Sequence, residues 1–336
     1  MSVWYKEADN NDIVISSRVR LARNLAGLPF PGRMNEEMFT ELKTRVKKAV
    51  EEISSEKLPL KYFETDDIPE NEINAMVERH VISPDFAMNC KNRALVLSPD
   101  ESVSIMIGEE DHVRLQVLYA GNSLDEAYAL ADALDTKLGE KLGFAYDERL
   151  GFLTECPTNI GTGLRASVML HLPLCESKNE ISSIADAAGK IGLTIRGIYG
   201  EGSKSKASMY QLSNQITLGL SEANAIENLK IIAGQIVERE KQSRELIDRL
   251  ELEDMVFRAL GTLKYARLLN TEELFQLVSM IKLGVDEGIL VNGEIKPIVM
   301  MIEAQPHMLM QRRTASTPRE RDEVRAQTVR DILKAE

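Results

Sequence analysis

The sequence predicts an α+β protein with a largely antiparallel sheet flanked by helices, followed by a small all-helical C-terminal domain. Short apolar segments separated by turn residues indicate strands, whereas longer segments with apolar residues three or four apart indicate helices. Strands and separated helices alternate irregularly up to about residue 250, which is typical of an α+β arrangement. From about 252 onward only helical spacing remains. We therefore expect domains at 1–250 and 251–336.

Composition narrows the class of protein before any motif is considered. The chain has 336 residues, of which 43% are hydrophobic, and a net charge of −12. Such an acidic chain is poorly suited to bind nucleic acid or an anionic membrane. No run approaches the roughly 20 apolar residues that span a bilayer, and the polar N-terminus does not resemble a secretory signal.

Cysteine and histidine usage points to a reducing compartment. Three cysteines, an odd number, and four scattered histidines show no metal-ligand spacing. We expect neither a disulfide framework nor a protein-bound metal site, and we expect a cytoplasmic location.

The first predicted strand, 12–23, contains two arginines that share one face of the sheet. Arg18 and Arg20 are two residues apart, so their side chains point the same way. Two neighbouring guanidinium groups repel each other unless an anion lies between them, although a solvated strand face is the alternative. A helix is expected at 36–53, where Asn35 can cap its N-terminus.

Further elements follow in order. Ser123 and Glu126 form the pattern of a capping box, which predicts a helix to about residue 142 with Leu130, Leu134, Leu138 and Leu142 facing inward. Other expected elements are strands at 94–97, 102–107, 113–119, 149–154, 166–172 and 193–199, and helices at 180–191 and 222–250.

The C-terminal domain ends in a basic cluster on an otherwise acidic chain. Its expected apolar positions are Leu260, Leu263, Leu268, Leu274, Leu277 and Ile281, and its cluster contains Arg312, Arg313, Arg319, Arg321, Arg325 and Arg330. Arg321 and Arg325 are four apart, so they lie on one helix face, fit to grip a phosphate. An exposed charged helix is the alternative interpretation.

Isolated arginines in short motifs are the main functional signal. Neither GxxxxGK[ST] nor a GxGxxG between a strand and a helix occurs in the chain. If the protein handles a nucleotide, guanidinium groups must therefore hold the phosphates, which their planar forks do well. The candidates are Arg18, Arg20, Arg114, Arg165 and Arg196.

The run GEEDHVR at 108–114 is the second signal, because it places Glu109, Glu110 and Asp111 side by side. Crowded carboxylates repel, so one is expected to have a raised pKa or to lie beside a cation. A carboxylate here could orient a nucleophile and accept its proton. The alternative is an exposed acidic turn.

Three further residues are weak candidates when taken alone. Cys156 follows a strand in the polar loop CPTNIGTG, where a nearby cation would lower the pKa of its thiol, although a small buried thiol is the simpler interpretation. Glu201 lies in the glycine-bearing loop GEGSKSKAS and could close over a substrate, or could be a surface glutamate. His80 is equally compatible with packing.

Together, SSRVRLAR, EEDHVR, CPTNIGTGLRAS and the RG…GE loop resemble the phosphagen kinases, in the family order and over about 12–250. The resemblance implies that the five arginines bind ATP, with Ser16 and His80 at the nucleotide. It also implies that Glu110 positions the substrate guanidinium and acts as base, assisted by Glu109. Glu201 would be the flexible-loop glutamate, Cys156 the active-site thiol, and Mg²⁺ the required ion.

Three departures point to one branch of that family. Only about a dozen residues precede the first arginine strand, Met169 replaces a usual histidine, and a helical C-terminal domain is added. These features, with RASVMLHLP, RGIYGEGS and RDEVRA, are similar to the bacterial protein-arginine kinases of the McsB type. That likeness implies that Arg321, Asp322 and Arg325 bind phosphoarginine.

The resemblance therefore implies a protein-arginine kinase with an open cleft that takes arginines on protein surfaces. It further implies marking of proteins for the ClpC–ClpP protease in stress response, and an activator McsA. A homo-oligomer, in which the Arg321/Arg325 site binds a phosphoarginine of a neighbouring subunit, is a further hypothesis. The alternatives are a kinase for free arginine or another small guanidine, and a phosphoarginine-binding adaptor without catalysis.

Overall fold

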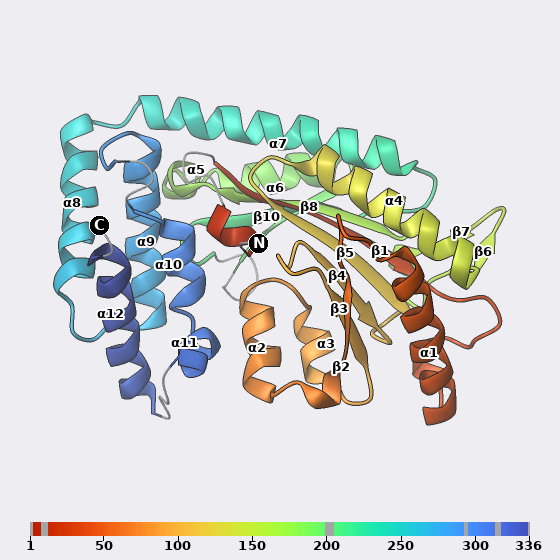
Figure 1. Ribbon diagram of the computed structural model, residues 1–336. Coiled ribbons are helices and arrows are strands. Elements are labelled where there is room, and N and C mark those ends of the chain that lie inside the picture. The colour runs from red at the N-terminus through yellow and green to blue at the C-terminus, as the bar shows by residue number, and fades with distance from the viewer. Residues whose placement is uncertain (1–2, 8–12, 199–204, 292–294, 313–316, 335–336) are drawn as a thin grey trace. The chain divides into compact units, whose positions relative to one another are not determined.

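The structure, a computed structural model, describes residues 3–7, 13–198, 205–291, 295–312 and 317–334 (Figure 1). The strands are β1 (Val14–Arg23), β2 (Lys61–Glu64), β3 (Ala94–Leu97), β4 (Val103–Ile107), β5 (Val113–Ala120), β6 (Tyr146–Asp147), β7 (Gly151–Phe152), β8 (Leu164–His171), β9 (Leu193–Gly197) and β10 (Met209–Asn214). The helices of the first half are α1 (Glu36–Ile53), α2 (Glu70–Glu78), α3 (Pro84–Met88), α4 (Leu124–Leu142), α5 (Pro173–Ser177) and α6 (Ile181–Gly189). The later helices are α7 (Glu222–Glu245), α8 (Arg249–Tyr265), α9 (Thr271–Asp286), α10 (Pro297–Glu303), α11 (Pro306–Arg312) and α12 (Pro318–Lys334).

Within the described residues, eight strands form one sheet in the order β2-β3-β4-β5-β1-β8-β10-β9. The ladder from β2 to β5 is antiparallel throughout, with Lys61 opposite Leu97, Ala94 opposite Ile107, and Ile107 opposite Val113. The predicted α+β class with a largely antiparallel sheet is thereby confirmed. By its contacts the chain divides into two compact units, and β1, β8, β10 and α7 each contribute residues to both.

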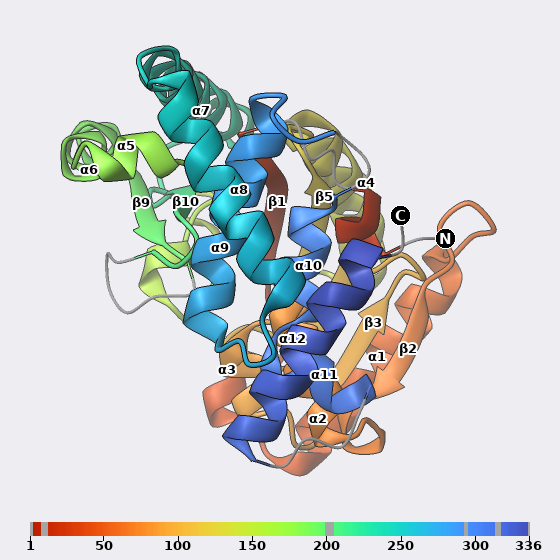
Figure 2. The same cartoon turned by 90° about the vertical axis from the view of Figure 1, so that its left-hand side faces the viewer.

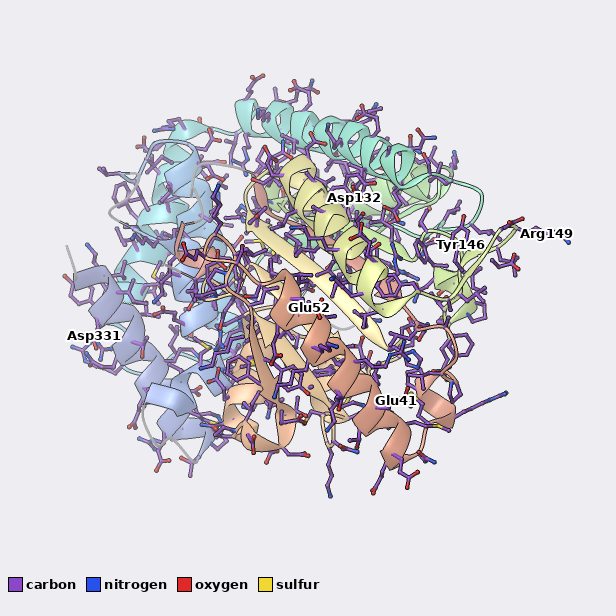
Figure 3. The ribbon with its side chains drawn as sticks, turned by 45° about the vertical axis from the view of Figure 1, so that its right-hand side comes forward. Glu41, Glu52, Asp132, Tyr146, Arg149 and Asp331 are labelled. Atoms are coloured by element: carbon purple, nitrogen blue, oxygen red, sulfur yellow. The ribbon has the colours of Figure 1, made fainter. Side chains whose placement is uncertain are left out.

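The first unit comprises residues 1–4, 17–167 and 213–231. Helices α1 and α4 contact each other, and they contact β4 and β5 respectively (Figure 1). Their exposed faces carry charges of both signs, with Glu41, Glu52 and Asp132 among the acids (Figure 3) and Lys47 and Lys141 among the bases. A separate apolar cluster joins α2 and α3 to β3 and β4 through Ile73, Met76, Val81, Ile82, Phe86, Leu95, Leu97 and Met106.

The second unit comprises residues 5–16, 168–212 and 232–336. Its C-terminal part is a bundle in which α8 packs on α9 and α12, and α10 packs on α9, α11 and α12 (Figure 2). Helices α8 and α9 approach closely at Gly284, where a Cβ atom would lie 2.5 Å from the Val256 side chain. The expected domain boundary near residue 250 remains a prediction.

Buried charges also hold this second unit together. The Lys282 ammonium is fully buried and lies 2.5 Å from Asp286, which also accepts a hydrogen bond from Arg244. Glu240 pairs with Arg244 at 3.1 Å and accepts hydrogen bonds from two backbone amides at the start of α5. Such a network is costly to break, because each partner left alone would be a buried, unpaired charge.

Three expectations about local structure were wrong. The Ser123 side chain makes no capping hydrogen bond and instead donates to the Ala120 carbonyl, so the predicted capping box does not form. The expected strand at 149–154 shrinks to β7, which pairs with β6 in a short hairpin. The expected helix 222–250 ends at Glu245, because Asp248 begins α8 by accepting from the amides of Leu250 and Glu251.

Apolar spacing also predicted only some of the buried positions in α4 and in the C-terminal bundle. In α4, Leu134, Leu138 and Leu142 are buried as expected, whereas Leu130 is only partly buried. In the C-terminal bundle, the buried members of the expected set are Leu263, Leu274 and Ile281. Leu268 is 50% exposed, because it lies in the connection after α8 rather than on a packed helix face.

Candidate active site

Four of the predicted arginines occupy neighbouring strands of the first unit. Arg18 and Arg20 lie on β1, Arg114 lies on β5 and Arg165 lies on β8, and β1 runs between the other two strands. Burial, and then the charges of Arg18, Arg114 and Arg165, lower the pKa of Arg20 well below its usual value. The buried Nε of Arg20 has no hydrogen-bond partner among the described residues. This concentration of positive charge favours an anion at the sheet face.

The acidic run forms the tight turn between β4 and β5, closed by a hydrogen bond from the Gly108 amide to the His112 carbonyl. The Glu109 carboxylate is almost buried, lies 2.7 Å from Arg114 and accepts a hydrogen bond from Ser83. Burial raises its pKa, and Arg114 opposes that rise. Glu109 is thus a carboxyl with a raised pKa beside a cation, as expected, but burial rather than the neighbouring Glu110 is the main cause of the rise.

Glu110 differs from its neighbour in exposure. Its side chain is 43% exposed, at 3.3 Å from Arg114. The Asn159 amide also donates to it, at 3.4 Å. Glu110 is thus a charged acceptor that two donors orient while one side stays open to solvent.

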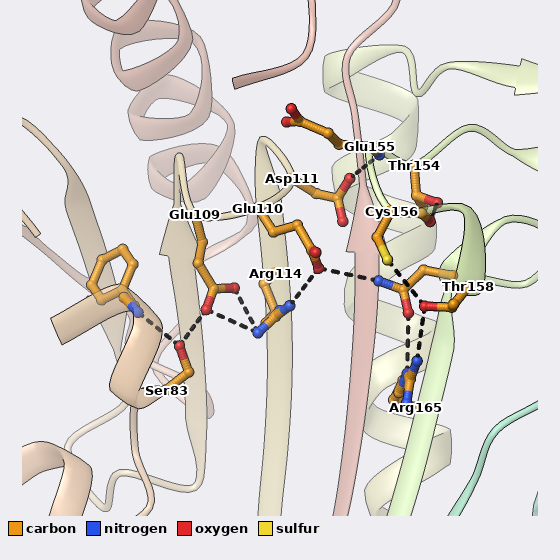
Figure 4. A network of polar contacts seen from close by, with 12 residues as sticks. Ser83, Glu109, Glu110, Asp111, Arg114, Thr154, Glu155, Cys156, Thr158 and Arg165 are labelled. Carbon is orange, nitrogen blue, oxygen red and sulfur yellow. Dashed lines mark hydrogen bonds and ion pairs between the residues drawn. The ribbon is translucent and has the colours of Figure 1, made fainter. Parts of the chain in front are cut away.

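The loop after β7 faces these acids. The Cys156 sulfur lies 3.0 Å from the Thr158 hydroxyl, which accepts a hydrogen bond from Arg165 (Figure 4). Arg165 Nε also donates to the Asn159 carbonyl oxygen at 3.1 Å. Asn159 therefore links Arg165 to Glu110 through its two ends. Sequence analysis missed this residue, although it lies inside the quoted CPTNIGTG motif.

A cavity of about 570 Å³ brings several of these groups together. It is lined by Pro31, Gly32, Asp85, Phe86, Asn89, Arg93, Gly108, Glu109, Glu110, Arg114, Glu155 and Cys156. Both glutamates, the thiol and one arginine of the cluster thus share one open space. Its volume falls in the range of small-molecule sites.

The remaining predicted nucleotide residues are more scattered. His80 adopts a left-handed backbone conformation, and burial together with Arg18 lowers its pKa to about 3. Ser16 is buried on β1. Arg196 is exposed on β9 of the second unit, and Glu201 lies outside the described residues.

The predicted phosphoarginine residues lie on α12. Arg325 is only 1% exposed, and it donates to the carbonyls of Ala304 and Leu269 and to the Asp322 carboxylate. Its guanidinium therefore joins α12 to the residue that follows α10 and to the connection between α8 and α9. Arg321 is partly exposed.

Arg23, the third arginine of SSRVRLAR, was not singled out by its sequence. It is buried and pairs with Asp135 at 2.8 Å and with Glu222 at 3.3 Å. It also donates to the Thr162 carbonyl and lies 3.5 Å above the Phe152 ring. The sequence did contain one signal for this difference. Alternate residues of a strand point to opposite faces, so Arg23 lies on the face opposite to Arg18 and Arg20.

Among the described residues, no group of three or more His, Cys, Asp or Glu side chains could hold a metal ion. Mg²⁺ bound through nucleotide phosphates and one or two carboxylates needs no such group, and Glu109 and Glu110 are the carboxylates in the cavity. In the part of the chain that the structure describes, no helix is both long and apolar enough to cross a membrane.

Comparisons with known proteins agree with this geometry. Residues 41–243 match the family model of the ATP:guanido phosphotransferase C-terminal catalytic domain, and residues 249–336 match that of the protein-arginine kinase McsB C-terminal domain. A protein-arginine kinase of Halothermothrix orenii is 42% identical, covering 99% of this chain and 97% of the relative. One of Clostridium kluyveri is 43% identical, covering 99% of each.

Solved structures support the fold. Lombricine kinase superposes with a TM-score of 0.61 at 22% identity, covering 70% of each chain. The duplicated taurocyamine kinase of Schistosoma mansoni, with transition-state analogue components bound, gives a TM-score of 0.63 at 25% identity. It covers 80% of this chain and 39% of the duplicated one. The chain therefore belongs to the ATP:guanido phosphotransferases and, within them, to the family of protein-arginine kinases.

Proposed function

We propose that this protein transfers the γ-phosphate of ATP to arginine side chains of proteins. The observation that carries the proposal is the arginine cluster of β5, β1 and β8 ending at a cavity lined by Glu109 and Glu110. The cluster supplies positive charge for a triphosphate, and the glutamates supply acceptors for a guanidinium. Family membership supports the same assignment.

In this mechanism the arginines align the phosphates and stabilise the charge that develops on the transferring group. Bound Mg²⁺ would neutralise further phosphate charge. A guanidinium is a poor nucleophile because its pKa exceeds about 12. Glu110, open on one side and held by Arg114 and Asn159, would orient the substrate guanidinium and accept its proton. A substrate nitrogen then bonds to the γ-phosphorus while the bond to ADP breaks.

Glu109 would assist mainly by holding Arg114, since its carboxylate is nearly buried. The resemblance, rather than the geometry, assigns Arg196 and Glu201 to the same site. Cys156 lines the cavity, and its role in transfer remains a prediction.

The wider role is also a proposal. Substrates would be proteins with exposed arginines, and their modification would mark them for ClpC–ClpP degradation in stress response, with McsA as activator. We propose a cytoplasmic homo-oligomer, and the three free cysteines are consistent with a reducing compartment. Phosphoarginine binding by Arg321, Asp322 and Arg325 completes the proposal.

The test uses γ-labelled ATP and Mg²⁺ with either an arginine-rich unfolded protein or free arginine. We expect label on the protein, lost on acid treatment because a phosphorus–nitrogen bond is acid-labile. Glu110→Gln should abolish labelling while leaving the unfolding transition unchanged.

Each other outcome has a defined meaning. Label on free arginine alone would move the assignment to a small-guanidine kinase. An absence of label in both samples, with phosphoarginine binding retained, would favour a non-catalytic adaptor. Full activity in Glu110→Gln would remove the role given to that carboxylate.

A further inference from the structure

The acidic turn presents two glutamates to the cavity and buries the two residues that follow them. Asp111 and His112 are both fully buried, in contrast to the half-exposed Glu110. Neither contributes an atom to the cavity lining. For these two residues the interpretation of the run as an exposed acidic turn is wrong. Their contacts show what they do instead.

The side chain of Asn24 bonds both to the acidic turn and to the segment that precedes Cys156. The Asn24 Nδ2 group donates to Asp111 at 2.7 Å and to the Leu153 carbonyl at 2.9 Å. The Asn24 Oδ1 atom accepts from the His112 amide at 2.9 Å. Asn24 itself is 2% exposed at the end of β1. A single buried side chain thus ties the acidic turn to the segment that leads to Cys156.

Asp111 completes the connection from the other side. Its Oδ1 atom accepts from the Glu155 amide at 2.9 Å as well as from Asn24 (Figure 4 shows the contact with Glu155). Glu155 directly precedes Cys156, and both line the cavity. The backbone carrying the thiol is therefore fastened to the residue next to Glu110.

The histidine fixes the same turn to the chain after β1. His112 Nδ1 accepts from the Leu25 amide at 2.9 Å, so its Nε2 carries the proton and donates to the Pro29 carbonyl at 2.8 Å. Burial lowers the pKa of His112, which keeps the ring neutral, as this pair of contacts requires.

The contacts among Asn24, Asp111 and His112 include a buried polar atom that packing alone does not require. Asp111 Oδ2 is buried and has no hydrogen-bond partner among the described residues. Buried polar atoms without partners are rare and costly, and they tend to occur where function demands the arrangement. An apolar joint of the same shape would avoid that cost.

We propose that Asn24 and Asp111 are positioning residues for phosphoryl transfer. They hold the Glu110 turn and the Cys156 loop at a fixed separation across the cavity. This inference deepens the proposed function and rests on it for its catalytic consequence. Placement matters because an error of about 1 Å at a reacting group can cost roughly 100-fold in rate.

The test is a double-mutant cycle with Asn24→Asp and Asp111→Asn. Asn24→Asp sets two carboxylates against each other, whereas Asp111→Asn keeps an acceptor oxygen for the Asn24 amide and removes the negative charge. The double variant restores one amide donor facing one carboxylate acceptor, with the two residues exchanged. We expect kcat to fall about 100-fold in Asn24→Asp with little change in KM for ATP, and to recover substantially in the double variant.

A second readout does not depend on kinase activity. Alkylation of Cys156 by iodoacetamide, followed by mass spectrometry of its peptide, reports the freedom of the loop. We expect alkylation about tenfold faster in Asn24→Asp, because losing a hydrogen bond to a charged group favours local opening by roughly that factor. Wild-type protein without kinase activity would refute the proposed function, whereas unchanged alkylation in Asn24→Asp would refute the positioning role.

Ser98→Ala is the matched control. Ser98 is buried in the turn between β3 and β4, where its hydroxyl oxygen accepts from the Val103 amide, and it lines no part of the cavity. We expect it to lower Tm without changing kcat or Cys156 alkylation. The proposal is overturned if kcat in Asn24→Asp falls no more than in Ser98→Ala, or if the double variant recovers nothing. If Asn24→Asp does not fold, Asn24→Leu, which removes the amide while nearly keeping its shape, is compared with the same control.

Discussion

At the scale of single residues, the site shows how one residue type takes opposite roles. Arg20 lies among three other arginines, opposed by Glu109 alone, and its buried Nε has no hydrogen-bond partner among the described residues, whereas Arg23 pairs with Asp135 and Glu222. The first arrangement costs free energy until an anion arrives, and the second stabilises the fold directly. Alternation along β1 separates these roles, because the two side chains point to opposite faces.

Histidine burial predicts a loss of stability in acid. Burial and Arg18 lower the pKa of His80 from 6.5 to about 3 in the folded protein. Below pH 6.5, His80 binds a proton in the unfolded chain but stays neutral in the folded one. Neutral His80 therefore costs no stability above pH 6.5. Between pH 7 and pH 5 the free energy of unfolding decreases by about 2 kcal/mol, and it continues to decrease until the pH approaches 3.

The measurement is denaturant unfolding at several pH values for wild type and His80→Asn. Asparagine tolerates the left-handed backbone at this position. We expect a shallower pH dependence in the variant, not a flat one, because burial also lowers the pKa of His112 and His171. Parallel curves for the two proteins would contradict this account of His80.

At the scale of elements, local signals predicted most helices and strands, and tertiary contacts decided the rest. The apolar spacing of α1 and its Asn35 cap were sufficient, since the Asn35 side chain accepts from the Met38 amide. The pattern at Ser123 was misleading because its hydroxyl bonds to a nearer carbonyl. No local pattern could show that Asn24 meets Asp111, which is 87 residues away.

Tertiary contacts, rather than the local charge pattern, also decide the roles of the two arginines of α12. Arg325 is buried and holds two backbone carbonyls, so Arg325→Ala should lower the free energy of unfolding by about 3 kcal/mol. Arg321 is partly exposed, and Arg321→Ala should lower the free energy of unfolding by less than Arg325→Ala does. Thermal unfolding and titration with phosphoarginine separate stability from binding.

If α12 binds phosphoarginine, Arg321→Ala should weaken binding at least about tenfold while lowering Tm less than Arg325→Ala does. Arg325→Ala is a poor test alone, because lost binding could follow from a loosened bundle. Unchanged affinity in Arg321→Ala would count against the phosphoarginine site.

At the scale of the whole molecule, charge is distributed unevenly. The chain carries a net charge of −12, yet four arginines of the first unit lie on neighbouring strands. Sequence composition established the first fact and argues against bulk nucleic-acid binding. The motif resemblance implied that these arginines share a site, and the strand order shows that their strands are neighbours although Arg18 and Arg165 are far apart in the chain. A negative molecule with a local positive site should attract basic proteins while binding a nucleotide.

This distribution predicts that salt acts selectively on protein substrates. At saturating ATP, raising NaCl from about 0.05 M to about 0.5 M should lower kcat/KM for a basic unfolded protein by about tenfold, because long-range attraction is screened. An acidic unfolded protein with the same number of arginines is the matched control, and its kcat/KM should not fall. The kcat of both substrates should change little, since positioning within the site acts over short distances. An equal fall in kcat/KM for both proteins would mean that salt weakens the site itself, and that the net charge of the chain does not select its substrates.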